Sequence, residues 1–412
     1  MRPRAHATLT LFVATLATLA SCAAQVASPT KAQLDSIRDD GAWSVREVGV
    51  GVVLRQRRFE ALFDKPQCLT VLEAKADAFG LRFDVEAPGK LVRTSAMAER
   101  LGAIAAINGG FFAPDAKPTG LLKLDGALQN PASAGNGSVG IDEKGRVTIE
   151  QRSEGDWPQM REALGAGVVL VEGGKIVDQG ARQRAIRHPR SAIGVTKDGA
   201  IVLLAIDGRA KEAAGTSYEE TATVLVAFDC ERGINLDGGG STTLWTAGEG
   251  VCNHPCDNRK FDHDGERAVA NALLLFGCSV VEVDDDTAKL EGKGFVQETD
   301  IAQRRGTDCA IWTGSEATNA RAVFSAHLPF AGHWTAHVWL PAAKEASHAF
   351  RSGVATGDAE PLLTDAPQAG QPGSWVEIGA IELKAKGRAS VAIASARGLP
   401  FVADAVKFVQ VD

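Results

Sequence analysis

Short apolar runs separated by turn residues fill the sequence from Trp43 to about Gly277. Examples are VGVGVVLRQ, CLTVLEAKA, GLRFDVEAP, AGVVLVEGGKIV and AVANALLLFG. Runs of this length that are rich in Val, Ile and Phe and bounded by Gly, Asp or Pro are typical of β-strands. The KDG triplet at Lys197–Gly199 lies between two such runs and predicts a hairpin turn. This part of the chain must therefore fold mainly as β-sheet.

Two segments interrupt the strand pattern with features of helices. TSAMAERLGA offers Thr94 or Ser95 as an N-cap. SYEETATVLVAF has Ser217 as its cap and Glu220 three residues later, which is the pattern of a capping box. We therefore predict an α+β domain over residues 43–279, strand-rich with a few helices.

The charged segment VEVDDDTAKLEGKG breaks this pattern, and residues 280–292 are predicted to be a linker. Residues 293–412 again contain strand-like runs with aromatic residues, such as AVFSAHLP and HWTAHVWLP. They suit an all-β sandwich that serves as an accessory domain, with carbohydrate binding as an open role. Alternation along these runs places the tryptophans in the core, and sugar stacking is the alternative. The tryptophans concerned are Trp312, Trp334, Trp339 and Trp375.

The first residues, MRPRAHATLTLFVATLATLASC, have the features of an export signal. An Arg-bearing start precedes an apolar stretch that is short for a membrane span. Leu19-Ala20-Ser21-Cys22 resembles the lipobox of bacterial lipoproteins, in which the cysteine is lipidated. We expect residues 1–22 to be a lipoprotein signal peptide and residues 23–42 a tether. The protein would be exported and held by a lipid anchor at the outer membrane, in the periplasm or at the cell surface. A plain cleaved signal peptide is the alternative.

The number of cysteines and the net charge indicate the cellular compartment and the class of partner. Seven cysteines less Cys22 leave six, an even number that suits disulfides in an oxidising compartment. CNHPC at Cys252–Cys256, with His263 nearby, fits no standard zinc spacing, so a local disulfide or a pinned loop is expected there. The net charge of −7, without a long basic stretch, argues against nucleic acid as a partner.

Three consecutive glycines follow a predicted strand in NLDGGGSTTLW. Ordering a glycine loses more backbone entropy than ordering any other residue, so three together suggest that a ligand or another strand comes close to the backbone. Their N–H groups would form a nest for an anion. A second glycine turn, Asn108-Gly109-Gly110, follows another predicted strand, and the two turns would form one site if the strands are neighbours. The alternative is a tight turn in which glycine only supplies a positive φ.

Several motifs, taken in their order along the chain, resemble those of known protein families. AAINGGFF, RHPRSAIGVTKDGAIVLLAIDGR, GINLDGGGSTTLW and RAVANALLLF, over about residues 45–278, resemble the phosphodiester glycosidase family. This family includes the lysosomal enzyme that removes N-acetylglucosamine from a phosphodiester to uncover mannose 6-phosphate. AHLPFAGHWTAHVWLP, GSWVEIGAIEL and FVADAVKFV are similar to the golvesin C-terminal or xanthan-lyase-type accessory β-sandwich. The resemblance implies an exported hydrolase that cleaves a sugar-1-phosphodiester, such as a GlcNAc-1-phosphodiester, in a glycan or cell-envelope polymer.

The implied reaction sets what the site must contain. It expels a phosphate monoester, which is a good leaving group, so anion recognition and a carboxylate matter more than strong acid assistance. The predicted catalytic residues are Asp237, Asp207 and Asn108, with His188 as an alternative base. The residues predicted to bind phosphate or sugar are Arg190, Arg209, Arg267, Gly109, Gly110, Asn235, Gly238, Gly239, Gly240, Ser241 and Asn271.

The sequence contains no motif for nucleotide binding, zinc proteolysis or serine-hydrolase chemistry. GxxxxGK[ST], HExxH, GxSxG and dinucleotide-binding patterns are absent, so we predict no cofactor. A divalent cation on Asp207 and Asp237 stays an open alternative, because two ligands are too few to predict a site. The expected partner is a carbohydrate or phosphoglycan. Two other functions stay open, namely a different hydrolase of exopolysaccharide or peptidoglycan and a non-catalytic glycan-binding surface lipoprotein.

Overall fold

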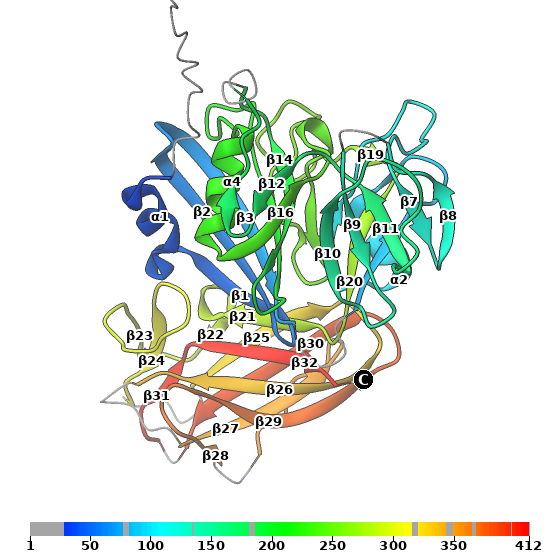
Figure 1. Ribbon diagram of the computed structural model, residues 1–412. Coiled ribbons are helices and arrows are strands. Elements are labelled where there is room, and N and C mark those ends of the chain that lie inside the picture. The colour runs from blue at the N-terminus through cyan, green and yellow to red at the C-terminus, as the bar shows by residue number, and fades with distance from the viewer. Residues whose placement is uncertain are drawn as a thin grey trace, which may run out of the picture.

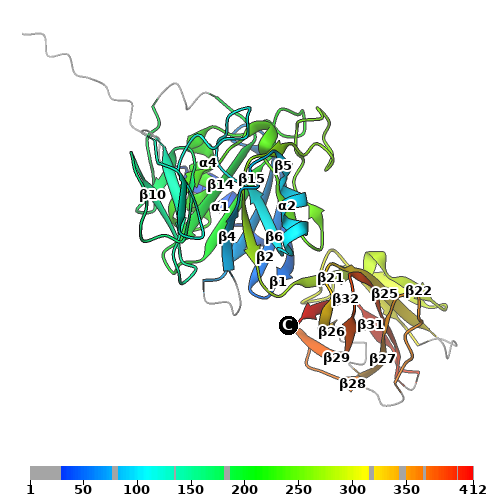
Figure 2. The same cartoon turned by 90° about the vertical axis from the view of Figure 1, so that its right-hand side faces the viewer.

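The computed structural model places two β-rich domains one after the other, as Figures 1 and 2 show. It describes residues 29–76, 82–133, 136–180, 186–314, 320–342, 349–364, 368–396 and 398–411. The predicted signal peptide and Cys22 lie outside these residues. In the described ranges no helix is both long and apolar enough to cross a membrane. The prediction of a strand-rich α+β domain followed by a β-sandwich is confirmed.

An eight-stranded antiparallel sheet forms the centre of the first domain (Figure 1). Its strands in spatial order are β1 (Ser44–Gly49), β2 (Val52–Leu62), β3 (Lys65–Ala74), β15 (Ile201–Ile206), β14 (Arg190–Thr196), β16 (Cys230–Asn235), β12 (Val169–Glu172) and β13 (Lys175–Ile176). Successive side chains of a strand point to opposite faces. Leu203 of β15 accordingly packs in one hydrophobic cluster and Leu204 in another. Both faces are buried, which explains why the sequence of β15 is apolar throughout.

Two five-stranded sheets and a two-stranded ribbon complete the strands of this domain. The first sheet contains β18 (Gly250–Val251), β17 (Leu244–Thr246), β6 (Ala105–Asn108), β20 (Ala272–Phe276) and β4 (Arg82–Glu86). The second contains β10 (Val147–Gln151), β9 (Gly137–Ile141), β11 (Glu162–Gly165), β7 (Leu122–Leu124) and β8 (Ala127–Asn130). The ribbon pairs β19 (Ala268–Val269) with β5 (Val92–Arg93). Leu72, Ile107 and Leu164, one from each large sheet, share one core, so the sheets pack face to face.

Helices cover the outer faces of these sheets. The helix α4 (Tyr218–Ala227) packs Leu225 against the eight-stranded sheet, and α2 (Thr94–Leu101) packs Met97 against the sheet that contains β6. Figures 1 and 2 show α4 and α2 on different sides of the domain. The predicted capping box of α4 is present, with Ser217 accepting from the backbone N–H of Glu220 at 3.2 Å.

Local predictions at two turns have different outcomes. The KDG hairpin joins β14 and β15 as predicted, and Gly199 has a φ of +88°. The N-cap of α2, in contrast, is Arg93 rather than Thr94 or Ser95. The Ser95 hydroxyl donates instead to the Glu266 carboxylate at 2.5 Å. This tertiary hydrogen bond replaces the capping role that the sequence predicts for Ser95.

The predicted tether over residues 23–42 is replaced by structure from Thr30 onward. Thr30 caps the helix α1 (Lys31–Arg38), and the short 3₁₀ helix η1 (Asp40–Ala42) follows. Ile37 is 1% exposed, and its carbonyl accepts a hydrogen bond from the Trp43 indole at 2.8 Å. Arg38 also donates to the Ala227 carbonyl at 3.1 Å, and Arg57 donates to the Ser36 carbonyl at 2.6 Å. These long-range contacts fix a segment whose polar composition suggested a tether.

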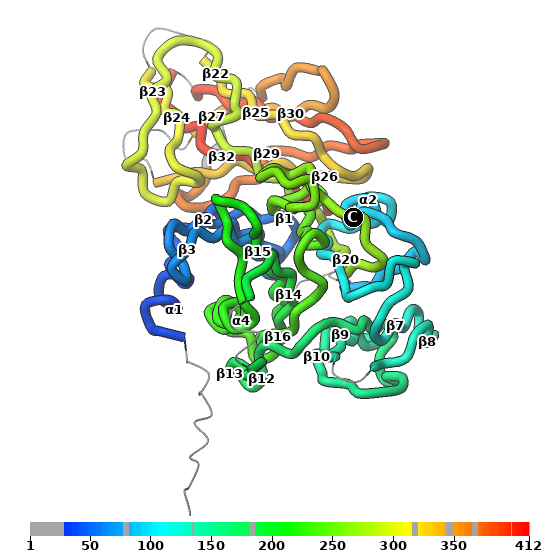
Figure 3. The backbone as a smooth tube through the Cα atoms, turned by 90° about the horizontal axis from the view of Figure 1, so that it is seen from above, coloured from blue at the N-terminus to red at the C-terminus, as the bar shows by residue number. Residues whose placement is uncertain are grey.

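The second domain is a sandwich of two sheets with a small third sheet at one end (Figure 3). One sheet contains β21 (Val280–Asp284), β32 (Ala405–Gln410), β26 (Gly332–Leu340) and β29 (Ser374–Leu383). The facing sheet contains β22 (Lys289–Glu291), β25 (Arg321–Leu328), β30 (Gly387–Ser395), β27 (Ala349–Thr356) and β28 (Gln368–Ala369). The third contains β23 (Phe295–Glu298), β24 (Cys309–Trp312) and β31 (Phe401–Ala403). Phe324, Trp334 and Phe408 are fully buried between the two large sheets.

Residues 280–292, predicted to be a linker, belong to this sandwich. They form β21, the 3₁₀ helix η3 (Asp285–Thr287) and β22. Val281 and Val283 pack in the core, and Arg305 forms an ion pair with the Glu282 between them at 2.8 Å. The charges that suggested a linker therefore have partners distant in the sequence. Arg305 neutralises Glu282, and Asp284 and Asp285 lie close to Asp404.

The four tryptophans of this domain divide into two pairs. Trp312 and Trp334 are 2% and 0% exposed and form part of the core, as predicted. Trp339 and Trp375 are half-buried and lie edge to face, with ring centroids 5.2 Å apart. The core interpretation therefore holds for the first pair only.

The expectation of disulfides is not supported by the structure. Cys68, Cys230, Cys252, Cys256, Cys278 and Cys309 are all free. Cys252 lies 3.6 Å from the Thr246 hydroxyl. Cys256 lies 3.7 Å from the Gly239 carbonyl and accepts from the Arg209 guanidinium at 3.9 Å. An even number of cysteines therefore did not indicate pairing.

Candidate active site

The two glycine turns meet, although the strands before them are not neighbours. Asn108 ends β6 and Asn235 ends β16, which lie in different sheets. The backbone N–H of Asp237 nevertheless donates to the Gly109 carbonyl at 2.9 Å. The Asn108 side chain in turn donates to the Asp237 carbonyl at 2.6 Å. Face-to-face packing of the two sheets, rather than strand pairing, therefore brings the turns together.

The first turn requires glycine because protein atoms surround it. A Cβ on Gly109 would lie 2.2 Å from the Asn271 side-chain oxygen, and one on Gly110 would lie 1.8 Å from the Gly165 carbonyl oxygen. Asn271 also accepts from the Gly110 N–H at 2.7 Å. Gly109 and Gly110 thus have a structural reason to be glycine that involves no ligand.

The three asparagines predicted at the site are buried beside the turns. Asn108, Asn235 and Asn271 are 0%, 1% and 1% exposed. The Asn108 side-chain oxygen accepts from the Ser191 hydroxyl at 2.6 Å and from the Thr243 N–H at 3.1 Å. Asn108 and Asn271, whose side-chain oxygens both accept hydrogen bonds, therefore position the turns. The predicted catalytic role of Asn108 therefore has no support from its surroundings.

The triple glycine lies directly beneath two arginine side chains. Gly239 has a φ of +65°, and a Cβ there would lie 3.0 Å from a terminal nitrogen of Arg209. A Cβ on Gly240 would lie 2.3 Å from a terminal nitrogen of Arg267. Gly238 approaches the Pro189 carbonyl in the same way. The turn is bare because two guanidinium groups and a carbonyl group occupy the space that side chains would fill.

The three predicted phosphate-binding arginines lie in different environments. Arg190 is 5% exposed, donates to the Thr216 carbonyl at 2.9 Å and stacks 4.1 Å from the Tyr218 ring centre. Its guanidinium group therefore makes structural contacts within the fold, and burial lowers its pKa. Arg267 is half-exposed and pairs with Asp257 at 2.5 Å. Arg209 is exposed and has no acidic partner within the described residues, so it is the arginine best placed for an anionic ligand.

Asp207 holds a histidine that the sequence prediction did not include. Its carboxylate lies 2.8 Å from Nδ1 of His254 and accepts from the backbone N–H of His254 at 2.8 Å. Asn253 donates to the same carboxylate at 3.1 Å. The Asp207 side chain is 2% exposed whereas that of His254 is 26% exposed. A sealed carboxylate that fixes an accessible imidazole leaves Nε2 for a ligand, as in hydrolase acid–base pairs.

His254 lines a cavity of about 290 Å³ whose walls are mainly basic. Arg209, Lys211, Arg259 and Lys260 line it, against one acid, Glu212. The His254 ring also stacks on Phe261, with centroids 3.9 Å apart and planes 9° apart. A cationic cavity with a fixed histidine is suited to an anionic group such as a phosphate.

Asp237 lies in the second turn, close to the arginines. Burial raises the pKa of its carboxyl group, and the Ser241 hydroxyl and the charge of Arg267 lower that pKa in part. A buried carboxyl group with a raised pKa beside a guanidinium is a common arrangement for an acid–base residue. The alternative base, His188, faces Arg209 at 3.5 Å, and burial followed by the charges of Arg190 and Arg209 lowers its pKa.

The CNHPC segment contains His254, which the sequence did not predict as a site residue. Its cysteines suggest a local disulfide or a pinned loop, but they are free, and the histidine between them lines the cavity. Its partner, Asp207, precedes Gly208 at the end of a strand and is one of the carboxylates that the sequence predicts to be catalytic. No feature of the sequence indicated that these two residues would meet.

Gly239→Ala tests whether the turn serves the site. We expect a loss of about 1–2 kcal/mol of stability, because an L-residue is strained at positive φ, and a rise in KM because the new methyl group pushes against Arg209. Gly102→Ala is the matched control, since Gly102 has a φ of +74° but open space around its Cβ position. Thermal unfolding and substrate kinetics measure both effects. Equal KM values for the two variants would show that the turn is only structural.

Comparisons with known proteins agree with the motifs. Residues 101–276 match the phosphodiester glycosidase family, and residues 280–410 match the golvesin C-terminal domain. A relative in Bacillus subtilis, the SPbeta prophage-derived protein YomE, is 27% identical over 205 residues, which cover 46% of this chain and 30% of that protein. The chain thus spans less than a third of the length of this relative.

Two solved structures resemble part of the chain. The catalytic domain of zebrafish N-acetylglucosamine-1-phosphodiester α-N-acetylglucosaminidase is 19% identical, with a TM-score of 0.46, and the match covers 58% of this chain and 84% of that one. A Synechocystis protein is 16% identical, with a TM-score of 0.47, over 55% of this chain and 62% of that one. On the family matches, the chain carries a phosphodiester glycosidase domain followed by a golvesin C-terminal domain.

Proposed function

We propose that the first domain hydrolyses the bond between the anomeric carbon of a sugar and a phosphodiester. The observation that carries this proposal is the basic cavity beside the Asp207–His254 pair, at the turn where Arg209 covers the triple glycine. This arrangement supplies an anion-binding group and a proton-transfer group next to each other. The family match supports the same reaction class.

In the proposed reaction, the phosphate lies in the cavity near Arg209 and His254. Water adds a hydroxyl group to the anomeric carbon, the bond to the phosphate oxygen breaks, and a phosphate monoester leaves. Asp237 takes the proton from the attacking water or attacks the carbon itself. His254, oriented by Asp207, donates a hydrogen bond to the departing phosphate oxygen. Because phosphate is already a good leaving group, this donation assists the step without being its main driving force.

Incubation with the methyl diester of N-acetylglucosamine 1-phosphate tests the proposal. Release of free sugar supports it, and Asp237→Asn should abolish most of that release. His333→Ala, a change at an exposed position of β26 in the second domain, is the matched control and should leave it unchanged. If no sugar is released, a glycan array separates the two alternatives. Turnover of an array glycan favours another glycan hydrolase, whereas retention without product favours a binding protein.

We also propose that the mature protein is exported and anchored through Cys22. The signal-like N-terminus and its lipobox-like tetrapeptide support this proposal. Two or more acyl chains are needed for stable membrane attachment. Cys22→Ala should therefore release the protein into the soluble fraction or block its processing, measured by fractionation of cells that express the full chain. Unchanged partition into membranes would contradict a lipid anchor on this cysteine.

A further inference from the structure

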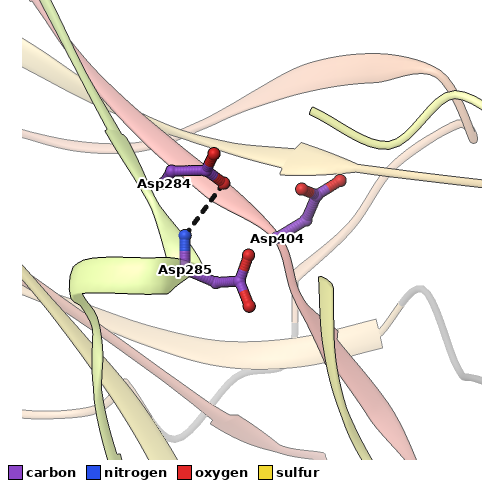
Figure 4. Close-up of side chains that lie close together, drawn as sticks. All are labelled: Asp284, Asp285 and Asp404. Atoms are coloured by element: carbon purple, nitrogen blue, oxygen red, sulfur yellow. Dashed lines mark hydrogen bonds between the residues drawn. The ribbon is translucent and has the colours of Figure 1, made fainter. Parts of the chain in front are cut away.

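Three aspartates of the second domain bring their carboxylates together, as Figure 4 shows. Asp284 ends β21, Asp285 begins η3, and Asp404 lies between β31 and β32. One oxygen from each carboxylate lies within 4.8 Å of those from the other two. The strands β21 and β32 pair with Asp284 opposite Ala405, so the cluster joins the first and last strands of the sandwich.

Two of these three carboxylates are buried, and that of Asp284 is half-buried. Asp285 and Asp404 are 2% and 0% exposed, and none of the three aspartates forms a salt bridge within the described residues. The nearby Arg305 guanidinium pairs with Glu282 instead, and only its backbone N–H donates to Asp404, at 3.1 Å. Burial, reinforced by the neighbouring aspartates, raises the pKa of Asp285 to about 7 and that of Asp404 to about 8. Three such groups repel one another unless protons or a cation neutralise them.

The Asp285 side chain supplies a second and independent observation. Both of its oxygens are buried, and neither has a hydrogen-bond partner among the described residues. The Gln297 side chain lies near enough to lower the pKa of this carboxyl group, but burial outweighs its effect. Buried carboxylate oxygens without donors are rare in folded proteins, because removing them from water without a partner is costly. In Figure 4 this carboxylate lies beside that of Asp404.

We propose that Asp284, Asp285 and Asp404 bind a calcium ion. Carboxylate oxygens are the ligands that hard divalent cations prefer, and the cluster holds no histidine or cysteine that would favour zinc. Calcium takes about six to eight oxygen ligands in flexible geometry, whereas magnesium keeps several waters and usually binds only one or two carboxylates. Three carboxylates whose oxygens all lie within 4.8 Å of one another therefore suit calcium. The bound ion would hold the two ends of the domain together.

Calcium addition to the full chain tests this site. In chelator-washed buffer, isothermal titration with CaCl₂ should give one site per chain with a Kd below about 1 mM. Excess calcium over EDTA should raise the melting temperature of the second domain by about 5–10 °C. Absence of both heat and thermal shift would overturn the proposal. An equal shift with MgCl₂ would overturn the assignment to calcium.

Two variants and a control locate the binding. Asp285→Asn and Asp404→Asn should each lose the calcium-induced shift. In EDTA they should melt at or above the temperature of the unchanged protein, because each relieves repulsion. Asp286→Asn makes the same charge change on the exposed neighbour in η3, and should keep the shift. If one aspartate variant fails to fold, the other decides the question. A shift retained by a folded variant would place the calcium elsewhere and overturn the assignment.

Discussion

Asp237→Asn is expected to lower kcat on a sugar-1-phosphodiester by about a hundredfold or more. The amide keeps the size of the side chain, but it removes the charge that activates water or attacks the anomeric carbon. KM should change little, because the proposed phosphate contacts come from Arg209 and the cavity. Steady-state kinetics on the methyl diester of N-acetylglucosamine 1-phosphate measure both constants.

The pH profile separates a catalytic Asp237 from a structural one. Burial raises the pKa of this carboxyl group above its ordinary value, and the residue must be ionised to act. Activity should therefore fall on acidification at a higher pH than an ordinary aspartate would give, and Asp237→Asn should lack this acid limb. Asp257→Asn is the matched control, because Asp257 pairs with the same Arg267 but lies exposed at the rim. Near-normal turnover by a folded Asp237→Asn variant would move the catalytic carboxylate elsewhere.

His254→Ala is the second change expected to have a large effect, with a loss in kcat of about a hundredfold. The alanine removes the Nε2 donor that we place beside the departing phosphate. Asp207→Asn should lower kcat in the same direction, because an amide no longer fixes the imidazole ring in the orientation set by the 2.8 Å contact between Asp207 and Nδ1. Kinetics on diesters with progressively poorer leaving groups provide the decisive measurement. The loss caused by His254→Ala should grow as the leaving group becomes poorer.

A matched substitution controls for damage to the cavity. His263 also stacks on the His254 ring, with centroids 4.5 Å apart, but its Nδ1 donates to the Asn253 carbonyl at 2.7 Å. His263→Ala should therefore cost stability more than activity. A fall in kcat as large as that of His254→Ala, in a variant of equal thermal stability, would mean that ring packing rather than proton transfer explains the effect.

The sequence alone determined the features that depend on neighbours along the chain. Short apolar runs bounded by turn residues identified the strands, the Ser217–Glu220 pair identified the start of α4, and the KDG triplet identified a hairpin. The ordered motifs identified both families. The two glycine turns predicted that a site lies between them. These features rest on local backbone preferences and short-range hydrogen bonds, which a sequence expresses directly.

Only the tertiary structure decided which residues meet. Asp207 and His254 lie 47 positions apart in the sequence and touch because a loop folds back over the end of β15. Asn108, Asn235 and Asn271 were predicted to contact substrate, yet sheet packing buries them beneath the turns. The acidic residues 284–286, whose charge suggested a linker, instead include two that join Asp404 across a pair of antiparallel strands. Such contacts depend on how sheets stack and strands register, and a linear pattern of residue types does not specify either.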